Sequence, residues 1–267
     1  MPIDSTDPRS PSVQIADHLR EEIVGGVYGP GDKIPSEREL SDEWDVSPQT
    51  IRQAIAILKN EGLVEGQPGR GVFVRTQPPL IRLGTERFSR AYRAAGKSAQ
   101  QADAEAAGLS FRQEALELAD VPAPADVAEL LAVAAGATVF KRYRREFVDE
   151  KPNQLAASYY RLEDVEGTAI RETKTGPGGS MARLEDVGFV LTEIYEEWGP
   201  SRMPNPRTQE RRLLQLSKGV PVAQVERRLY GYRASAGETE ADERVLEVFQ
   251  SIINGAMIKF THRFRIQ

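Results

Sequence analysis

Two helix-start signals that follow each other closely are the feature that most constrains this fold. Ser36 lies three residues before Glu39, which is the spacing of a capping box. Ser47 is followed directly by Pro48, a residue favoured at the first position of a helix. The run PGDKIPSERELSDEWDVSPQTIRQAI therefore predicts two short helices joined by a tight turn at Asp45.

The flanking residues extend this pair to a recognisable domain. The run VQIADHLREEIVGG places apolar residues four apart and ends in two glycines, so it predicts a preceding helix. After the pair, Leu63–Glu65 and Val72–Arg75 surround a Pro-Gly-Arg-Gly tip and predict a β-hairpin. Three helices followed by a hairpin form a winged helix-turn-helix.

Composition excludes several classes of protein. The chain has 267 residues, no cysteine and two histidines, His18 and His262, which lie at opposite ends of the sequence. We therefore expect no metal site, no cofactor and no cysteine or histidine catalysis. An apolar run long enough for a membrane span or a secretion signal is absent, so we expect no membrane partner and a cytoplasmic location. The net charge of −5 means that any basic surface for nucleic acid must be local.

The sequence pattern divides the chain into four parts. Residues 1–11 read as a disordered lead-in, 12–76 as the winged helix-turn-helix, 77–108 as a flexible linker and 109–267 as a second domain. In the second domain, predicted helices alternate with runs such as TVFKRYRREFV and NQLAASYYR, in which apolar and polar residues alternate. This alternation is typical of half-buried antiparallel strands, so the predicted fold class is α+β.

Both parts resemble known families. Residues 12–75 resemble the DNA-binding domain of GntR-family bacterial transcription regulators through GDKIPSERELSDEWDVSPQTIRQAIAILKNEGLVEGQPGRGVFV. Through VFKRYRREFVDEKPNQLAASYY, TGPGGSMARLEDVGFVLTEIYE and RMPNPRTQERRLLQLSKGVPVAQVERRLYG, residues from about 109 to 264 resemble the UTRA effector domain of the HutC subfamily. The resemblance implies an antiparallel-sheet α/β fold similar to that of chorismate lyase. The segment VLEVFQSIINGAMIKF departs from the usual ending of these domains, so effector contacts made there by relatives are not carried over.

The resemblance implies a DNA-binding surface at the second helix, the third helix and the hairpin tip. A helix that enters the major groove brings its first residues to base edges, where Gln suits adenine and Arg suits guanine. Asp17, Glu21, Asp42 and Glu43 are expected to face away from the DNA. The alternative is a solvated face of a protein-interaction domain. The expected DNA-binding residues are Arg38, Ser47, Gln49, Thr50, Arg52, Gly69, Arg70 and Gly71.

Arginines and hydroxyls on two strands of the second domain suit a phosphate or carboxylate on a small ligand. The alternative is an exposed sheet face with ion pairs, for instance to Glu146 or Glu226, because a one-residue slip in register reverses which side chains face a cavity. GPGGSMARLE is expected to be a turn that leads to a helix capped by Ser180, and Arg207 is expected to meet solvent. The candidate effector-binding residues are Arg142, Arg144, Arg145, Ser158, Tyr160, Glu193, Glu226 and Tyr230.

These expectations combine into a sequence-specific transcription regulator that is not an enzyme. We expect a homodimeric repressor that binds a pseudo-palindromic operator in double-stranded DNA and responds to a small, anionic effector. One alternative is a ligand-blind regulator whose second domain only dimerises. Another is a lyase-like enzyme fused to a winged helix, which rests on fold likeness alone.

Overall fold

The protein is described by a computed structural model that covers residues 3–4, 6–76, 81–82, 87–205, 208–216 and 219–260. Arg207 and residues 261–267 of the expected second domain lie outside the described residues. The chain divides into two units, Met1–Gln77 with Leu216–Val220, and Pro78–Gln215 with Pro221–Gln267.

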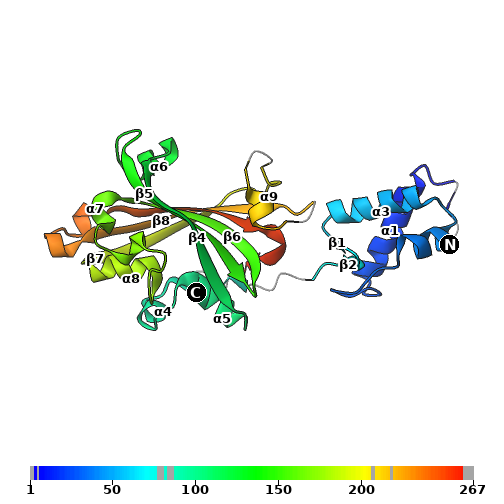
Figure 1. The fold of residues 1–267 in the computed structure, drawn as a ribbon, viewed down its shortest axis with the longest axis horizontal. Helices are drawn as coiled ribbons and strands as arrows, with labels where there is room; N and C mark the ends of the chain where they lie inside the picture. The colour runs from blue at the N-terminus through cyan, green and yellow to red at the C-terminus, as the bar shows by residue number, and fades with distance from the viewer. Residues whose placement is uncertain are drawn as a thin grey trace, which may run out of the picture. The chain divides into compact units, whose positions relative to one another are not determined.

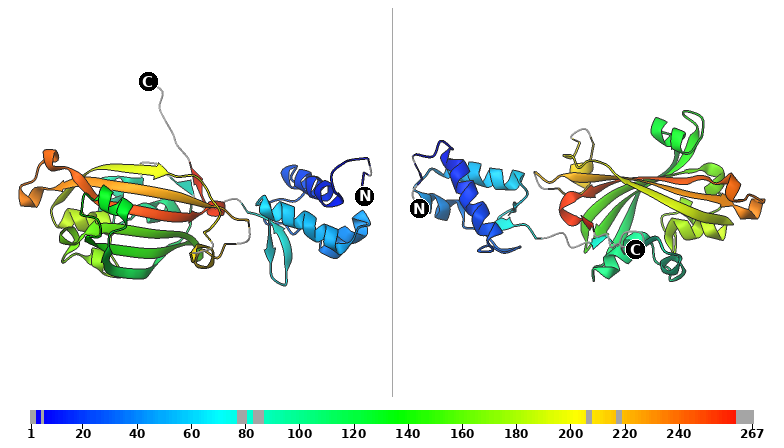
Figure 2. Two further views of the ribbon diagram at one scale, coloured as in Figure 1. Left: turned by 90° about the horizontal axis from the view of Figure 1, so that it is seen from above. Right: turned by 180° about the vertical axis from the view of Figure 1, so that it is seen from behind.

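The first unit has the predicted order of three helices and a hairpin, so the winged helix-turn-helix is confirmed. In both views of Figure 2, α1 and α3 lie against each other, and the hairpin follows α3. The strands β1 and β2 pair antiparallel, with Gln67 opposite Gly71 at the tip. Its elements are α1 (Pro11–Val24), α2 (Glu37–Trp44), α3 (Pro48–Asn60), β1 (Val64–Gln67) and β2 (Gly71–Val74).

Local capping explains where α2 begins and ends. The Ser36 hydroxyl accepts a hydrogen bond from the Glu39 amide at 3.3 Å, and the Ser36 amide donates to Glu39 Oε2 at 2.7 Å, so the capping box is complete. Asp45 then ends the helix in the left-handed region with φ of 50°. The apolar faces of the three helices meet in one core, formed mainly by Ile15, Leu19, Leu40, Trp44, Ile51, Ile55 and Leu58.

The second unit is built on one antiparallel sheet. Among the described residues the strand order is β4-β5-β6-β9-β8-β7, so β4 and β7 are the edge strands. A separate, short parallel pair is formed by β3 (Ile81–Arg82), which precedes the sheet strands in the sequence, and β10 (Lys259–Phe260), which follows them. The sheet strands are β4 (Phe111–Pro122), β5 (Thr138–Val148), β6 (Lys151–Arg161), β7 (Phe189–Trp198), β8 (Val222–Arg233) and β9 (Arg244–Asn254).

Helices cover the two faces of this sheet differently. Figure 1 shows α4, α5 and α8 on one face and α6 and α9 near opposite ends of the other face. One apolar core, which includes Phe140, Tyr160 and Leu229, packs under α8. A second core, which includes Val139 and Tyr159, packs under α6. The helices are α4 (Arg90–Ala94), α5 (Ala99–Ala106), α6 (Ala125–Leu130), α7 (Leu162–Val165), α8 (Gly179–Asp186) and α9 (Glu210–Leu213).

The segment expected to be a flexible linker, residues 77–108, is structured in its second half. It contains α4 and α5, and a buried ion pair joins Arg87 Nη1 to Asp103 Oδ2 of α5 at 3.0 Å. Arg87 Nη2 also donates to Glu196 Oε1 of β7 at 2.6 Å. Because a buried guanidinium needs its carboxylate partners, these contacts hold the segment against the sheet.

Candidate DNA interface and effector cavity

The start of α3 presents two hydroxyls that also stabilise the helix. Ser47 Oγ accepts a hydrogen bond from the Thr50 amide at 3.2 Å, and it lies 3.0 Å from Thr50 Oγ1. Each hydroxyl can make further hydrogen bonds, since it offers one donor and two acceptor positions. The N-terminus of α3 also carries a partial positive charge. Both features suit a phosphate group of DNA.

Arg52 projects from the exposed side of α3 and is held by two polar neighbours. Its Nε and Nη2 donate to Gln49 Oε1 at 3.3 and 3.1 Å. Its Nη1 lies 3.6 Å from Glu37 Oε2, although Glu37 belongs to α2. The side chains of Arg52 and Glu37 are 54% and 47% exposed, so the pair is open to a ligand from solvent.

Arg38 extends into solvent from α2, with 92% of its side chain exposed. Its Nε lies 3.9 Å from Asp42 Oδ2, one helical turn away. Asp42 therefore lies on the same side of α2 as Arg38, because residues four apart share one face of a helix. Such an exposed pair contributes little to stability, so Arg38 remains available to phosphate.

The hairpin tip presents Arg70 between two glycines. The Arg70 amide donates to the Gln67 carbonyl at 3.0 Å and closes the turn, while the guanidinium lies 5.5 Å from the centre of the Phe73 ring. Gly69 and Gly71 have φ of 72° and 123°, which side chains rarely adopt. At Gly71 a Cβ would also lie 2.6 Å from Lys33 Cε. The tip therefore needs these glycines to hold Arg70 in its exposed position.

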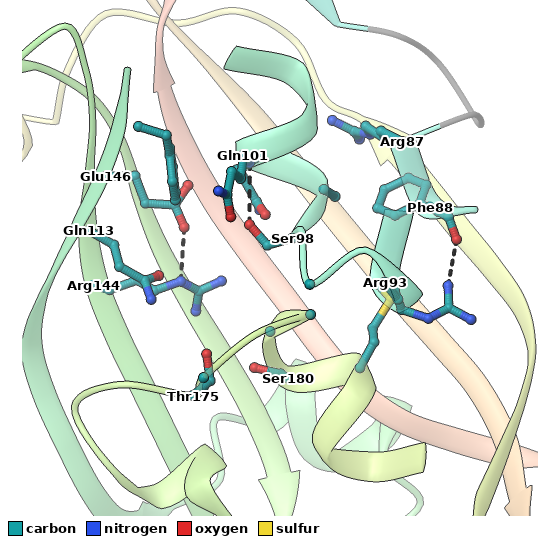
Figure 3. Close-up of a pocket in the computed structure, with 18 of the residues that line it drawn as sticks. Arg87, Phe88, Arg93, Ser98, Gln101, Gln113, Arg144, Glu146, Thr175 and Ser180 are labelled. Atoms are coloured by element: carbon teal, nitrogen blue, oxygen red, sulfur yellow. Dashed lines mark hydrogen bonds and ion pairs between the residues drawn. The ribbon is translucent and has the colours of Figure 1, made fainter. Parts of the chain in front are cut away.

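A small cavity in the second unit, the Arg144 cavity, lies on the sheet face that carries α4, α5 and α8. Its volume is about 130 Å³. Figure 3 shows its polar side chains arranged around a common centre, contributed by β4, β5, α5 and the loop before α8. Its lining includes Phe88, Arg93, Ser98, Gln101, Arg142, Arg144, Glu146, Thr175, Gly178, Ser180, Met181, Arg227 and Glu247.

Arg144 is one of the arginines that line this cavity. Only 7% of its surface is exposed. Its Nε donates to Glu146 Oε1 at 2.9 Å and its Nη1 to Ser158 Oγ at 3.0 Å. Within the described residues Nη2 has no hydrogen-bond partner, and Figure 3 shows the guanidinium directed toward the space between Ser98 and Thr175. A guanidinium N–H that faces a cavity can donate a charge-assisted hydrogen bond to an anionic acceptor, so this position suits a bound anion.

A buried carboxylate forms the floor beside Arg144. Glu247 Oε1 accepts from the Tyr160 hydroxyl at 2.5 Å, and Oε2 accepts from Arg227 Nη2 at 2.9 Å. Burial alone would raise the pKa of Glu247, but the charge of Arg227 and the hydrogen bonds from Tyr160 and Ser158 more than offset it, so the pKa lies below its usual value. Burial and the neighbouring Glu247 raise the pKa of Tyr160. At neutral pH the floor therefore holds an ionised carboxylate and a neutral phenol.

Two helices begin at the rim of the cavity. Ser98 caps α5 by accepting from the Gln101 amide at 3.2 Å. At α8 the cap is Gly178 with φ of 78°, and no side chain caps it. This corrects the expectation that Ser180 is the cap, because Ser180 lies inside the first turn. Two helix N-termini, each with a partial positive charge, therefore face one cavity together with Arg144.

Arg142 also lines the cavity, but its guanidinium is bonded to backbone carbonyls. It is 1% exposed, and its guanidinium donates to the carbonyls of Ile170 at 3.1 Å, Thr173 at 3.0 Å and Glu172. Burial and the charge of Arg144 lower the pKa of Arg142, although an arginine stays protonated. These bonds hold the chain just before Thr175, so Arg142 positions the loop that leads to α8.

The structure separates the other predicted effector residues from this cavity. Arg145 lies on the opposite sheet face, where it pairs with Glu114 Oε2 at 2.7 Å. Glu226 also lies there and pairs with Arg228 at 2.7 Å, while Tyr230 packs against the core under α6. Glu193 is exposed on β7 and lines a different hollow. The expectation that all of them share one site is corrected, because successive strand residues face opposite sides.

Several lining residues were not among the sequence candidates, notably Ser98, Gln101, Thr175 and Glu247. Glu247 carries a usable signal, because it is a lone carboxylate in the apolar run VLEVF and such a residue needs a buried partner. Ser98, Gln101 and Thr175 come from loops and a helix start far apart in the sequence. Only the fold brings them together.

Together the winged helix-turn-helix and the α+β domain with its cavity define a DNA-binding transcription regulator with an effector domain. Residues 11–74 match the family described as bacterial regulatory proteins, gntR family, and residues 106–255 match the UTRA domain. The chain belongs to the GntR family of transcription regulators and carries a UTRA domain.

Individual relatives agree with this assignment. An uncharacterized HTH-type transcriptional regulator of Streptomyces coelicolor is 36% identical over 80% of this chain and 81% of its own length. The HTH-type transcriptional repressor NagR of Bacillus subtilis is 24% identical over 84% of this chain and 86% of its length. The crystal structure of PhnF from Mycobacterium smegmatis shares the fold, with a TM-score of 0.55 and 23% identity over 95% of this chain and 100% of that chain.

None of the helices in the described ranges is long and apolar enough to cross a membrane. Nor does any group of three or more His, Cys, Asp or Glu side chains in the same ranges have an arrangement that could hold a metal ion.

Proposed function

We propose that this protein is a homodimeric cytoplasmic repressor that binds a pseudo-palindromic operator and is released by a small anionic effector. The observation that carries the effector assignment is the buried guanidinium of Arg144, whose Nη2 faces a cavity rimmed by the N-termini of α5 and α8. A phosphate or carboxylate oxygen would satisfy that donor. A repressor role is supported by the likeness to a relative named as a repressor.

The remaining polar groups of the Arg144 cavity suit the rest of a ligand. Glu146 and Glu247 are hydrogen-bond acceptors, so they suit a ligand that carries hydroxyl or N–H groups next to its anionic group. The altered segment VLEVFQSIINGAMIKF contributes Glu247 to this floor, which argues against a ligand-blind regulator.

On the DNA side, we propose that Arg52 and Gln49 read bases, with Arg38 and the hydroxyls of Ser47 and Thr50 on phosphates. Arg70 would reach the minor groove from the hairpin tip, between Gly69 and Gly71. The exposure of these side chains at the start of α3 and at the tip supports this proposal. Two copies related by a two-fold axis would read two half-sites.

Selection of operators from random double-stranded DNA by the full chain tests this function. We expect a motif with two inverted half-sites, and recovery of that motif should fall when an anionic metabolite that raises the melting temperature of the protein is present. A single half-site without symmetry would contradict the dimer. Recovery that no anion changes would contradict the effector assignment.

A further inference from the structure

A second hollow, the Trp198 groove, adjoins the Arg144 cavity. Its volume is about 490 Å³, several times that of the cavity. The two hollows share the side chains of Phe88, Arg93 and Met181, so they are adjacent to each other. The groove is lined by Phe88, Arg93, Met181, Leu191, Thr192, Glu193, Ile194, Glu196, Trp198 and Leu229.

An irregularity in β7 shapes this groove. Leu191 pairs with Gly231 and Ile194 with Leu229, so the two residues between them, Thr192 and Glu193, are left out of the regular register. β7 is an edge strand, where such bulges commonly redirect side chains. Leu191 and Ile194 are partly buried against the core under α8, and both line the groove. The bulge therefore leaves an apolar surface that is only partly covered.

Two charged residues that line the groove, Arg93 and Glu196, already have partners. Arg93 donates to Glu185 at 2.9 and 3.2 Å and to the Phe88 carbonyl at 2.6 Å. Glu196 accepts from Arg87 and, at 3.1 Å, from the indole N–H of Trp198. An apolar group placed in the groove would therefore separate no ion pair and cover surface that water now contacts.

From this contiguity we infer that the effector is an amphipathic anion, with its charged head in the Arg144 cavity and an apolar tail in the Trp198 groove. The inference rests on the proposed function for the head group. A cavity of about 130 Å³ holds a small charged group, whereas ligand sites usually occupy roughly 300–1,000 Å³. The groove supplies that additional volume, and its lining of Leu191, Ile194 and Leu229 matches a hydrocarbon tail.

Calorimetry of the full chain with two ligand series tests the inference. One series runs from inorganic phosphate and methyl phosphate to octyl phosphate, and the other from acetate to octanoate, all below their micelle concentrations. We expect affinity in the better series to rise about threefold to fourfold for each added methylene until the groove is filled. The comparison of series distinguishes a phosphate head from a carboxylate head.

Variants of β7 separate the tail from the head. Ile194→Thr should weaken octyl binding about threefold to tenfold and leave methyl phosphate or acetate binding unchanged. Thr192→Leu, at an exposed position of the groove, should strengthen octyl binding. The matched control is Val190→Thr, because Val190 is 40% exposed on the same strand and is outside the groove lining.

Two failures of this experiment have different meanings. If short anions bind through Arg144 but affinity does not depend on chain length, the tail assignment is overturned and the proposed effector site stands. If no member of either series binds, both the tail and the proposed anion site are overturned. Equal losses in Ile194→Thr and Val190→Thr would also reject the groove.

Discussion

Arg52 Nη1 lies 3.6 Å from Glu37 Oε2 across the turn between α2 and α3. Because Gln49 also accepts from Arg52, the guanidinium is held by both helices of the helix-turn-helix before any DNA is bound. A side chain that is already ordered loses less conformational entropy when it binds. This arrangement makes Arg52 the strongest candidate for a base-reading residue in the chain.

Replacing Arg52 with Ala should remove specific operator binding while the fold remains intact. We expect a loss of about 1–3 kcal/mol per half-site if Arg52 makes a bidentate contact with guanine. Fluorescence anisotropy with the selected operator and with unrelated DNA measures both affinities. Gln53→Ala, at the next exposed position of α3, is the control and should bind like wild type. Equal affinities for Arg52→Ala and wild type would reject the assignment.

The Arg70→Ala variant should weaken binding to all DNA sequences by a similar factor. An arginine that neutralises one phosphate contributes about one unit to the dependence of log affinity on log salt. Removing it should therefore lower that slope by about one per binding site. Titrations at several salt concentrations give the slope directly. An unchanged slope would exclude a phosphate contact at the hairpin tip.

Glu247→Gln should destabilise the protein at neutral pH by about 3 kcal/mol, because it breaks a buried ion pair with Arg227. The folded pKa of Glu247 is lowered from 4.5, so its stabilising contribution is fully present above about pH 4.5. That contribution is lost as the pH falls through the folded pKa. Urea unfolding of both proteins should show a difference that shrinks below pH 4.5. A difference that grows toward acid would contradict the ionised state.

Gly178→Ala should disturb the start of α8 and weaken anion binding. Gly178 has φ of 78°, and a Cβ there would lie 2.6 Å from Ala182 Cβ and 3.1 Å from the Arg93 carbonyl oxygen. The left-handed conformation alone costs roughly 1–2 kcal/mol for Ala. Gly136→Ala has φ of 75° and open space around the new Cβ, so it should show that cost and no loss of anion affinity. Thermal unfolding and calorimetry distinguish the two variants.

Short-range signals in the sequence predicted the first unit well. The caps at Ser36 and Ser47 and the apolar spacing on α3 determine local structure directly, and the three helices and hairpin appear in the predicted order. The strands β5 and β6 were also predicted, because their polar and apolar residues alternate. In contrast, β4 was missed: its run FRQEALELADVP is rich in Ala, Glu and Leu, which favour helix, and pairing with β5 overrides that preference.

The effector cavity was less predictable because it depends on register and on distant segments. Arg144 and Arg145 are adjacent in sequence, yet one is buried at the cavity and the other pairs with Glu114 on the opposite face. The sequence alone does not determine which of two neighbouring strand residues faces inward. The contributions of Ser98 and Ser180 depend on how α5 and α8 pack, which is tertiary information.

Arg144 and Arg145 lie on opposite faces of the sheet, and this difference allows the most direct test of the central claim. The claim is that an anion held by Arg144 controls DNA binding. Arg144→Lys keeps a cation beside Glu146 but removes the guanidinium fork, while Arg145→Lys makes the same change on the opposite sheet face. Operator affinity is measured by anisotropy for both variants and wild type, with and without the anion that most stabilises wild type.

We predict that wild type and Arg145→Lys lose operator affinity by the same factor when that anion is added. Arg144→Lys should bind the operator normally without the anion and respond about tenfold less or not at all, since a charge-assisted hydrogen bond contributes about 1.5–3 kcal/mol. By linkage, the operator should weaken anion binding to wild type by the same factor by which the anion weakens operator binding. An Arg144→Lys protein that responds to the anion like wild type would contradict the account.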